Sequence, residues 1–230
     1  MAAPDAPCRV FWASPVDPES AARLVRLLDA HERERLTRFH RAADRARYLA
    51  AHALTRLVLG DALSTPADRL VFDRTCRCGQ QHGKPTLREP GAPGFSFTHS
   101  GGFVGVAVAP GAVGLDVEEL RPLPDLDGMV RHVFSAAERE AGTVRDEVGF
   151  FSVWTRKEAV LKATGDGLSQ PMNAITLGRS EVAEWVSDNA PAGPMWVHEM
   201  APAEGYVAAT AGFGEVAPVV LEHDGNMLLH

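Results

Sequence analysis

A run of alternating apolar and polar residues near the middle of the chain constrains the fold most. Residues 95–98 read FSFT, and Gly101-Gly102 separates them from the apolar stretch FVGVAVAP at 103–110. Alternation with a period of two is typical of a half-buried strand, and a glycine pair between two such runs predicts a β-hairpin. We expect a third strand at 113–117, so the middle of the chain forms a sheet.

Helical patterns occur on both sides of this predicted sheet. Leucines at helical spacing predict a first helix from Asp17-Pro18 to about Ala30, and a second helical pattern ends at Gly60. After the strands, Ser135-x-x-Glu138 has the form of a capping box, and a longer helix is expected over 147–164, ending at Gly165. Short strand-like runs follow in the C-terminal region, at 174–177, 195–198 and 206–210.

This order of elements predicts an α+β protein of two lobes that meet near residue 110. The N-terminal lobe is expected over 1–110 and the C-terminal lobe over 111–230, each with a small, mostly antiparallel sheet packed against helices. At 230 residues, with 45% apolar and 23% charged residues, the chain is long enough to bury roughly 70% of its unfolded surface in a packed core.

Composition also limits the compartment and the partners. The formal net charge of −7 argues against general nucleic-acid binding. No apolar run approaches the roughly 18 residues that a membrane span needs, and none resembles a secretory leader. We therefore expect a cytoplasmic protein that does not associate with membranes.

The arginines are distributed unevenly. Between His31 and Gly60 there are seven Arg and three acidic residues, a local excess of four positive charges in an acidic protein. Such a patch is more often a solvated helix face, but it also suits a phosphate-binding site.

Three cysteines do not form a disulfide framework, which agrees with a reducing compartment. Cys76-x-Cys78 with His82 invites comparison with zinc sites, but zinc-binding cysteine pairs normally leave two to four residues between them and need a fourth ligand. A turn with small, buried cysteines is the simpler interpretation.

Glu158 occupies an unusual place on the helix predicted over 147–164. A rotation of about 100° per residue puts it near the middle of a stripe with Phe151, Trp154, Leu161 and Lys162. An unpaired buried carboxylate costs several kcal/mol, so something must compensate its charge. Either Lys162 forms a buried ion pair with it, or Glu158 binds a metal ion.

A second acidic pattern lies in Gly114-Leu115-Asp116-Val117-Glu118. Strand alternation puts Asp116 and Glu118 on one face, where the two charges repel each other unless a cation lies between them. Oxygen ligands of this kind suit Mg²⁺ bound together with a phosphorylated substrate. A solvent-facing edge strand would explain an isolated Asp-x-Glu equally well.

Four motifs in order favour the metal-binding interpretation: HGKP at 82–85, FSFTHSGG at 95–102, VGLDVEEL at 113–120, and FSVWTRKEAVLKATGDGL at 151–168. Together they resemble the 4′-phosphopantetheinyl transferase superfamily, specifically the longer, surfactin-type branch associated with nonribosomal peptide and polyketide synthesis. The spacing of GxDxE and WxxKEAxxK is the most specific part of this resemblance, which covers about residues 33–168.

The resemblance implies a monomer of two similar lobes related by a pseudo-twofold axis, with coenzyme A in the cleft between them. It implies that Asp116, Glu118 and Glu158 bind Mg²⁺, for which Mn²⁺ is expected to substitute, and that Lys162 contacts the coenzyme A pyrophosphate. The other implied nucleotide contacts are Lys84, Pro85, Thr98 and His99, with Arg47 and, as a second basic residue, Arg35 at the 3′-phosphate.

The implied reaction transfers 4′-phosphopantetheine from coenzyme A to a serine of an apo acyl or peptidyl carrier protein and releases 3′,5′-ADP. Metal and cations neutralise the pyrophosphate while a carboxylate accepts the serine proton. Glu158 is the expected base, Glu118 acting through a water is the rival, and Lys162 assists the leaving phosphate. The choice of carrier and of pathway, such as siderophore, antibiotic or fatty-acid synthesis, stays open.

Two other functions remain as alternatives. A Mg²⁺-dependent nucleotide hydrolase or phosphotransferase would be expected to have a phosphate-binding loop, and the sequence has no GxxxxGK[ST] motif. A non-enzymatic module that binds carrier proteins through the arginine-rich helices is the other alternative.

Overall fold

The computed structural model describes residues 6–75, 79–80, 83–89, 91–142, 144, 146–165 and 170–230. These residues form two compact units, one comprising Met1–Pro110 with Val220–His230 and the other Gly111–Val219. Both units contain helices and small sheets, so the predicted α+β class is confirmed. None of the helices described is long and apolar enough to cross a membrane.

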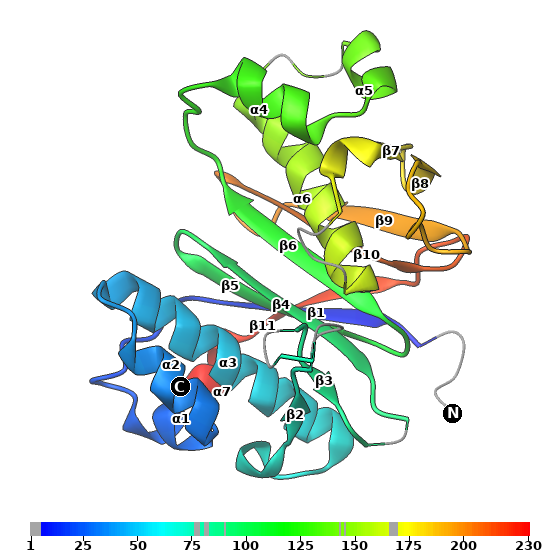
Figure 1. The fold of residues 1–230 in the computed structure, drawn as a ribbon. Helices are drawn as coiled ribbons and strands as arrows, with labels where there is room; N and C mark the ends of the chain where they lie inside the picture. Colours follow the sequence, from blue (N-terminus) through cyan, green and yellow to red (C-terminus); the bar gives the residue numbers. More distant parts are fainter. Residues whose placement is uncertain are drawn as a thin grey trace. The chain divides into compact units, whose positions relative to one another are not determined.

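The first unit is built on a four-stranded sheet in the order β11-β1-β5-β4. The helix α3 lies along one face of this sheet (Figure 1). Its core includes Leu49, Leu54 and Leu59 of α3 with Val104 and Val106 of β5, all fully buried. The strands are β1 (Cys8–Ala13), β4 (Gly94–Ser100), β5 (Phe103–Ala109) and β11 (Val220–Asp224), and a separate pair is β2 (Phe72–Asp73) with β3 (Thr86–Leu87).

The helices of this unit begin and end differently from the prediction. A single helix was expected from Asp17 to Ala30, but α1 spans Ala22–Leu27, Leu28 is extended, and α2 (Ala30–Thr37) begins at a capping box made by Asp29 and Glu32. The second predicted helix continues past Gly60, because α3 spans Ala42–Leu63 and ends at Ser64 in the left-handed conformation. The short helices η1 (Ala67–Arg69) and α7 (Asn226–Leu229) complete the unit.

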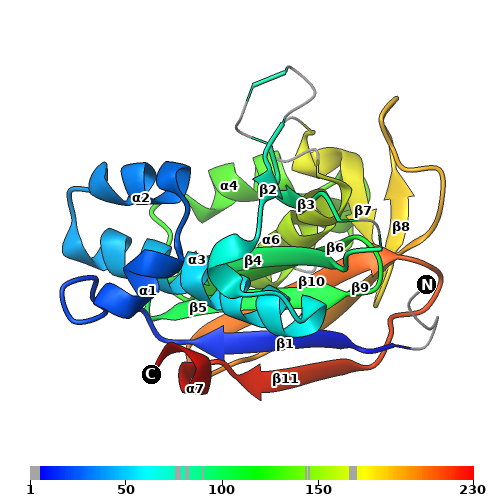
Figure 2. The same ribbon diagram turned by 90° about the horizontal axis from the view of Figure 1, so that it is seen from below.

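The last strand belongs to the first unit. β11 pairs in parallel with β1, with Cys8 opposite Val220 and Trp12 opposite Asp224 (Figure 2). The sequence predicted a single C-terminal lobe over residues 111–230. The two observed units differ from this prediction in residues 220–230, which belong to the first unit. All other strand pairs within the described sheets are antiparallel, as expected.

The second unit is built on a three-stranded antiparallel sheet in the order β6-β10-β9, with α6 along it (Figure 1). Its core contains Phe150, Phe151, Val160 and Leu161 of α6, which are fully buried. The elements are β6 (Val113–Glu119), α4 (Leu126–Val133), α5 (Ala136–Glu140), α6 (Glu147–Thr164), η3 (Met172–Ala174), β7 (Ile175–Leu177), β8 (Val182–Trp185), β9 (Met195–Met200) and β10 (Tyr206–Phe213).

The structure confirms two local predictions in this part of the chain. Ser135 and Glu138 form the predicted capping box at the start of α5. The helix α6 has the predicted bounds: Asp146 accepts a hydrogen bond from the backbone N–H of Gly149 at its start, and Gly165 ends it with a φ of +80°. A positive φ favours glycine, so the helix stops where the sequence indicated.

Candidate active site

The strand β6 and the helix α6 approach each other closely at Gly114. A Cβ atom at this position would lie 1.8 Å from the carbonyl oxygen of Ala159 and 2.6 Å from the backbone nitrogen of Ala163. Only glycine fits between two backbones at this distance. The missing side chain therefore brings the acidic face of β6 beside the C-terminal half of α6.

Asp116 is buried and interacts with this helix. Lys162 Nζ lies 2.6 Å from Asp116 Oδ1 and 3.0 Å from the carbonyl oxygen of Leu115. A buried carboxylate needs such a cation, because desolvation of an unpaired charge is costly. The sequence offered Glu158 as the ion-pair partner of Lys162, whereas the structure shows an ion pair between Lys162 and Asp116.

Glu118 lies two residues further along β6 and also has a cationic partner. Arg121 Nη1 lies 2.8 Å from Glu118 Oε2 and donates to the carbonyl oxygen of Glu119 at 2.9 Å. The guanidinium of Arg121 lies 4.7 Å from the centre of the Phe151 ring, so a cation–π contact fixes it against α6. Arg121 was not among the predicted site residues; its position three residues after Glu118 was the available signal.

Glu158 is half-buried on α6. Burial raises its pKa above the ordinary value, and the nearby charges of Asp116 and Glu118 raise it further, while the Lys162 ammonium opposes this effect. Asp116, Glu118, Glu158 and Lys162 thus form one electrostatic group, which we call the carboxylate site. Strand alternation predicted that Asp116 and Glu118 share a face, and helical rotation put Glu158 and Lys162 on one stripe; the family resemblance implied that the two pairs form one site.

The donor types at the carboxylate site suit a hard cation. Three carboxylates within electrostatic reach of one another favour a positive charge among them, and Mg²⁺ prefers such oxygen ligands. Among the residues that the structure describes, no group of three His, Cys, Asp or Glu side chains is arranged to hold a metal ion. The side chains of Lys162 and Arg121 contact Asp116 and Glu118, respectively.

Six of the seven residues predicted to contact coenzyme A lie in the first unit, and the seventh, Lys162, lies in the second. Arg47, on α3, donates to the carbonyl oxygen of Gly101 at 3.0 Å and pairs with Asp44. This contact connects Arg47 to the β4–β5 turn, where Gly101 has a φ of +52°. Thr98 is buried and His99 is exposed on β4, just before this turn. The structure therefore brings Arg47 to the hairpin that contains Thr98 and His99.

The remaining three predicted nucleotide contacts are on other elements. Lys84 and Pro85 are half-buried and directly precede β3. Arg35 is exposed on α2, in an open groove of about 310 Å³ lined also by His31, Glu34, Arg38 and Phe39.

The predicted cysteine turn and zinc alternative fall on Cys76, Cys78 and His82, which lie outside the described residues.

One buried ion pair near the carboxylate site was missed. Lys157, which precedes Glu158 on α6, is fully buried, and its Nζ lies 2.6 Å from Glu138 Oε2. It also donates to the carbonyl oxygens of Val133 and Ile175 at 2.8 and 2.7 Å. A lysine inside the helical motif was the signal for this pair, but its partner is too distant in the sequence to be inferred.

Comparisons with known proteins agree with the motifs. A family model described as the 4′-phosphopantetheinyl transferase superfamily matches residues 112–211, and one described as 4′-phosphopantetheinyl transferase, N-terminal, matches residues 12–111. The 4′-phosphopantetheinyl transferase HetI of Nostoc sp. is 34% identical over 216 residues, which are 89% of this chain and 88% of that protein.

Two relatives from Bacillus are also similar. The 4′-phosphopantetheinyl transferase psf-1 of Bacillus pumilus is 30% identical over 175 residues, which are 73% of this chain and 72% of that protein. Sfp of Bacillus subtilis is 25% identical over 172 residues, which are 73% of this chain and 74% of that protein. The chain therefore belongs to the 4′-phosphopantetheinyl transferase superfamily. The similarity to Sfp and psf-1 supports its place in the surfactin-type branch.

Proposed function

We propose that this protein transfers 4′-phosphopantetheine from coenzyme A to a serine of an apo acyl or peptidyl carrier protein and releases 3′,5′-ADP. The observation that supports this most directly is the carboxylate site, in which residues of GxDxE and of WxxKEAxxK lie side by side in a member of this superfamily. Membership of the superfamily supports this reaction, and the carboxylate site contains side chains that are chemically suitable for it.

In the proposed reaction, the carrier serine oxygen attacks the β-phosphorus of coenzyme A. An O–P bond to the serine forms, the bond between the β-phosphorus and the bridging oxygen breaks, and 3′,5′-ADP leaves with that oxygen. Glu158 accepts the hydroxyl proton in this proposal, and Glu118 acting through a water is the alternative base. Lys162 contacts the pyrophosphate and neutralises part of its developing charge.

The same site is the proposed location of Mg²⁺. Asp116, Glu118 and Glu158 would hold the ion, which supplies charge neutralisation at the pyrophosphate when it is bound. Mn²⁺ is expected to substitute because it accepts the same oxygen ligands. Lys162 and Arg121 balance the charges of Asp116 and Glu118 in the arrangement described above.

The proposed nucleotide contacts are Lys84, Pro85, Thr98 and His99, with Arg47 and Arg35 as candidate partners of the 3′-phosphate. Guanidinium groups suit this role because they bind phosphate through two parallel hydrogen bonds. We further propose that the protein acts as a cytoplasmic monomer, and that its carriers belong to peptide or polyketide assembly lines.

Intact-mass spectrometry of several apo carrier proteins, incubated with this protein, coenzyme A and Mg²⁺, tests the proposal. We expect a gain of one phosphopantetheine group per carrier, abolished when EDTA is present. A protein that binds carriers equally well with and without EDTA, but never adds the group to any of them, would instead be a binding module.

A further inference from the structure

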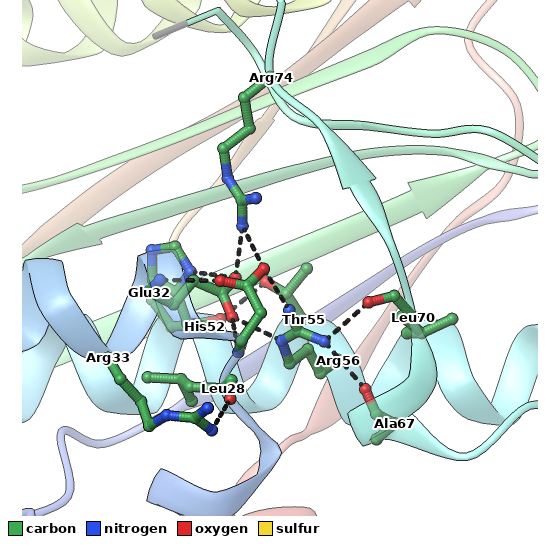
Figure 3. Close-up of polar contacts among 11 residues, drawn as sticks. Leu28, Glu32, Arg33, His52, Thr55, Arg56, Ala67, Leu70 and Arg74 are labelled. Atoms are coloured by element: carbon green, nitrogen blue, oxygen red, sulfur yellow. Dashed lines mark hydrogen bonds and ion pairs between the residues drawn. The ribbon is translucent and has the colours of Figure 1, made fainter. Parts of the chain in front are cut away.

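A buried network of charged side chains lies in the first unit, around Glu32. Glu32 Oε1 lies 3.0 Å from His52 Nδ1 and 2.8 Å from Arg74 Nη2, and Glu32 Oε2 lies 2.7 Å from Arg56 Nε (Figure 3). Asp29 Oδ2 contacts the same two arginines, at 2.8 Å from Arg56 and 3.2 Å from Arg74. Glu32 is 2% exposed, so its charge depends on these donors.

Arg56 connects this network to the segment that leads into β2. It is fully buried on α3, and its Nη1 donates to the carbonyl oxygens of Ala67 and Leu70, both at 3.1 Å. Its guanidinium lies 4.9 Å from the centre of the Phe72 ring, and that of Arg74 lies 5.4 Å from the same ring. Two cations thus contact one aromatic side chain of β2.

Arg74 connects the network to the residues before β3. Its side chain reaches the carboxylate of Glu32, as Figure 3 shows, while its carbonyl oxygen accepts a hydrogen bond of 2.7 Å from the backbone N–H of Gly83. Lys84 and Pro85 follow Gly83 directly. Pro85 also lines a cavity of about 10 Å³ together with Glu32, His52 and Arg74.

These contacts make Glu32 the common partner of three elements. Glu32 is part of the capping box at the start of α2, and it contacts two side chains of α3. It also contacts Arg74, whose carbonyl oxygen is hydrogen-bonded to Gly83, the residue before Lys84-Pro85. Apolar packing would stabilise such an arrangement at least as well. Hydrogen bonds, unlike apolar contacts, also fix the orientation of the side chains, because each donor must point at a carboxylate oxygen.

We propose that Glu32 is a positioning residue for coenzyme A binding: by holding Arg74, its carboxylate fixes the orientation of the Gly83–Pro85 segment. The inference rests on the proposed function in one respect, since it takes Lys84 and Pro85 as contacts of coenzyme A. Glu32 does not itself contact the substrate in this account.

The variant Glu32→Gln tests the proposal, with Glu34→Gln as its matched control. Glu34 is on the same helix but exposed, where it pairs with Arg38. We expect Glu32→Gln to raise the KM for coenzyme A by about tenfold or more, while kcat and the KM for the carrier stay near those of the parent protein. An equal loss with both substrates, or no loss, contradicts a positioning role.

Hydrogen exchange separates this inference from the proposed function, because it needs no coenzyme A. In the ligand-free protein, Glu32→Gln should speed exchange in peptides that cover Gly83–Leu87 and leave exchange in the peptides of α6 unchanged. Unchanged exchange at Gly83–Leu87 would overturn the inference even if transfer activity is found. Faster exchange there in a protein that neither binds coenzyme A nor transfers its arm would support the structural step and refute the assigned role.

A second variant covers the case in which Glu32→Gln does not fold. Asp29→Asn keeps a good N-cap residue and removes one carboxylate that contacts Arg56 and Arg74. Asp29→Asn should also raise the KM for coenzyme A and speed exchange at Gly83–Leu87, both by less than Glu32→Gln does. A folded Asp29→Asn protein with the parent's exchange at Gly83–Leu87 and the parent's KM for coenzyme A would contradict the proposal.

Discussion

The ammonium of Lys162 lies 2.6 Å from Asp116 Oδ1, so the GxDxE and WxxKEAxxK motifs are joined by an ion pair. Replacing the carboxylate removes both this partner and a proposed metal ligand. We expect Asp116→Asn to lower the rate of transfer at least about 100-fold. Asp188→Asn, at an exposed position, should leave the rate unchanged. Single-turnover transfer assays with both variants measure the difference.

The close approach of β6 and α6 predicts a stability effect at Gly114. Gly114→Ala should destabilise the protein by about 2 kcal/mol or more, because the added methyl group overlaps the backbone of α6. Gly111→Ala is the control, since a Cβ there meets nothing within 4 Å. Urea unfolding of both variants measures this, and equal stability of the two would mean that the backbones separate without cost.

The buried Lys157–Glu138 pair should be sensitive to the loss of one partner. Lys157→Met leaves the Glu138 carboxylate buried without its cation, which we expect to cost about 3–5 kcal/mol of unfolding free energy. The double variant Lys157→Met, Glu138→Gln should recover part of that loss, because no charge is then left unpaired. Arg38→Met, which breaks an exposed pair, should cost about 0.5 kcal/mol or less.

The lowered pKa of Glu32 predicts that the folded protein loses stability in acid. Burial would raise its pKa, but the hydrogen bond from His52 and the charges of His52 and Arg56 lower it to about 2, from an ordinary value of 4.5. A lowered folded pKa contributes stability that is complete above pH 4.5 and lost as the pH falls toward 2. The contribution is on the order of 3 kcal/mol.

Unfolding free energies measured between pH 7 and pH 3 check this. The stability difference between the parent protein and Glu32→Gln should shrink as the pH falls below 4.5. The corresponding difference for Glu34→Gln should stay small throughout. A parent-to-Glu32→Gln difference that is constant with pH would show that Glu32 keeps its ordinary pKa in the folded protein.

Local patterns in the sequence were sufficient for much of the second unit. The bounds of α6, its end at Gly165 and the capping box of α5 follow from interactions within a few residues. The grouping of Asp116 with Glu118 follows from strand alternation, and the inward position of Glu158 follows from helical rotation. These signals are short-range, so a single sequence contains them.

Features that depend on distant residues could not be predicted. The parallel pairing of β11 with β1 joins the two ends of the described chain, and the sequence of neither strand indicates which strand it pairs with. Glu138 is likewise far from Lys157 in the sequence, and Glu32 is far from Arg74. The break between α1 and α2 was missed because the leucine spacing continues through Leu28, while Asp29 starts a new helix.

The most direct test of the central claim is intact-mass spectrometry of an apo carrier protein incubated with coenzyme A, Mg²⁺ and one of three proteins: the parent chain, Glu158→Gln or the exposed-site control Glu140→Gln. The account predicts that the parent and Glu140→Gln add one phosphopantetheine group to each carrier, and that Glu158→Gln, although folded by circular dichroism, adds it at least about 100-fold more slowly. Transfer by Glu158→Gln at the parent's rate would contradict the assignment of this carboxylate to the reaction.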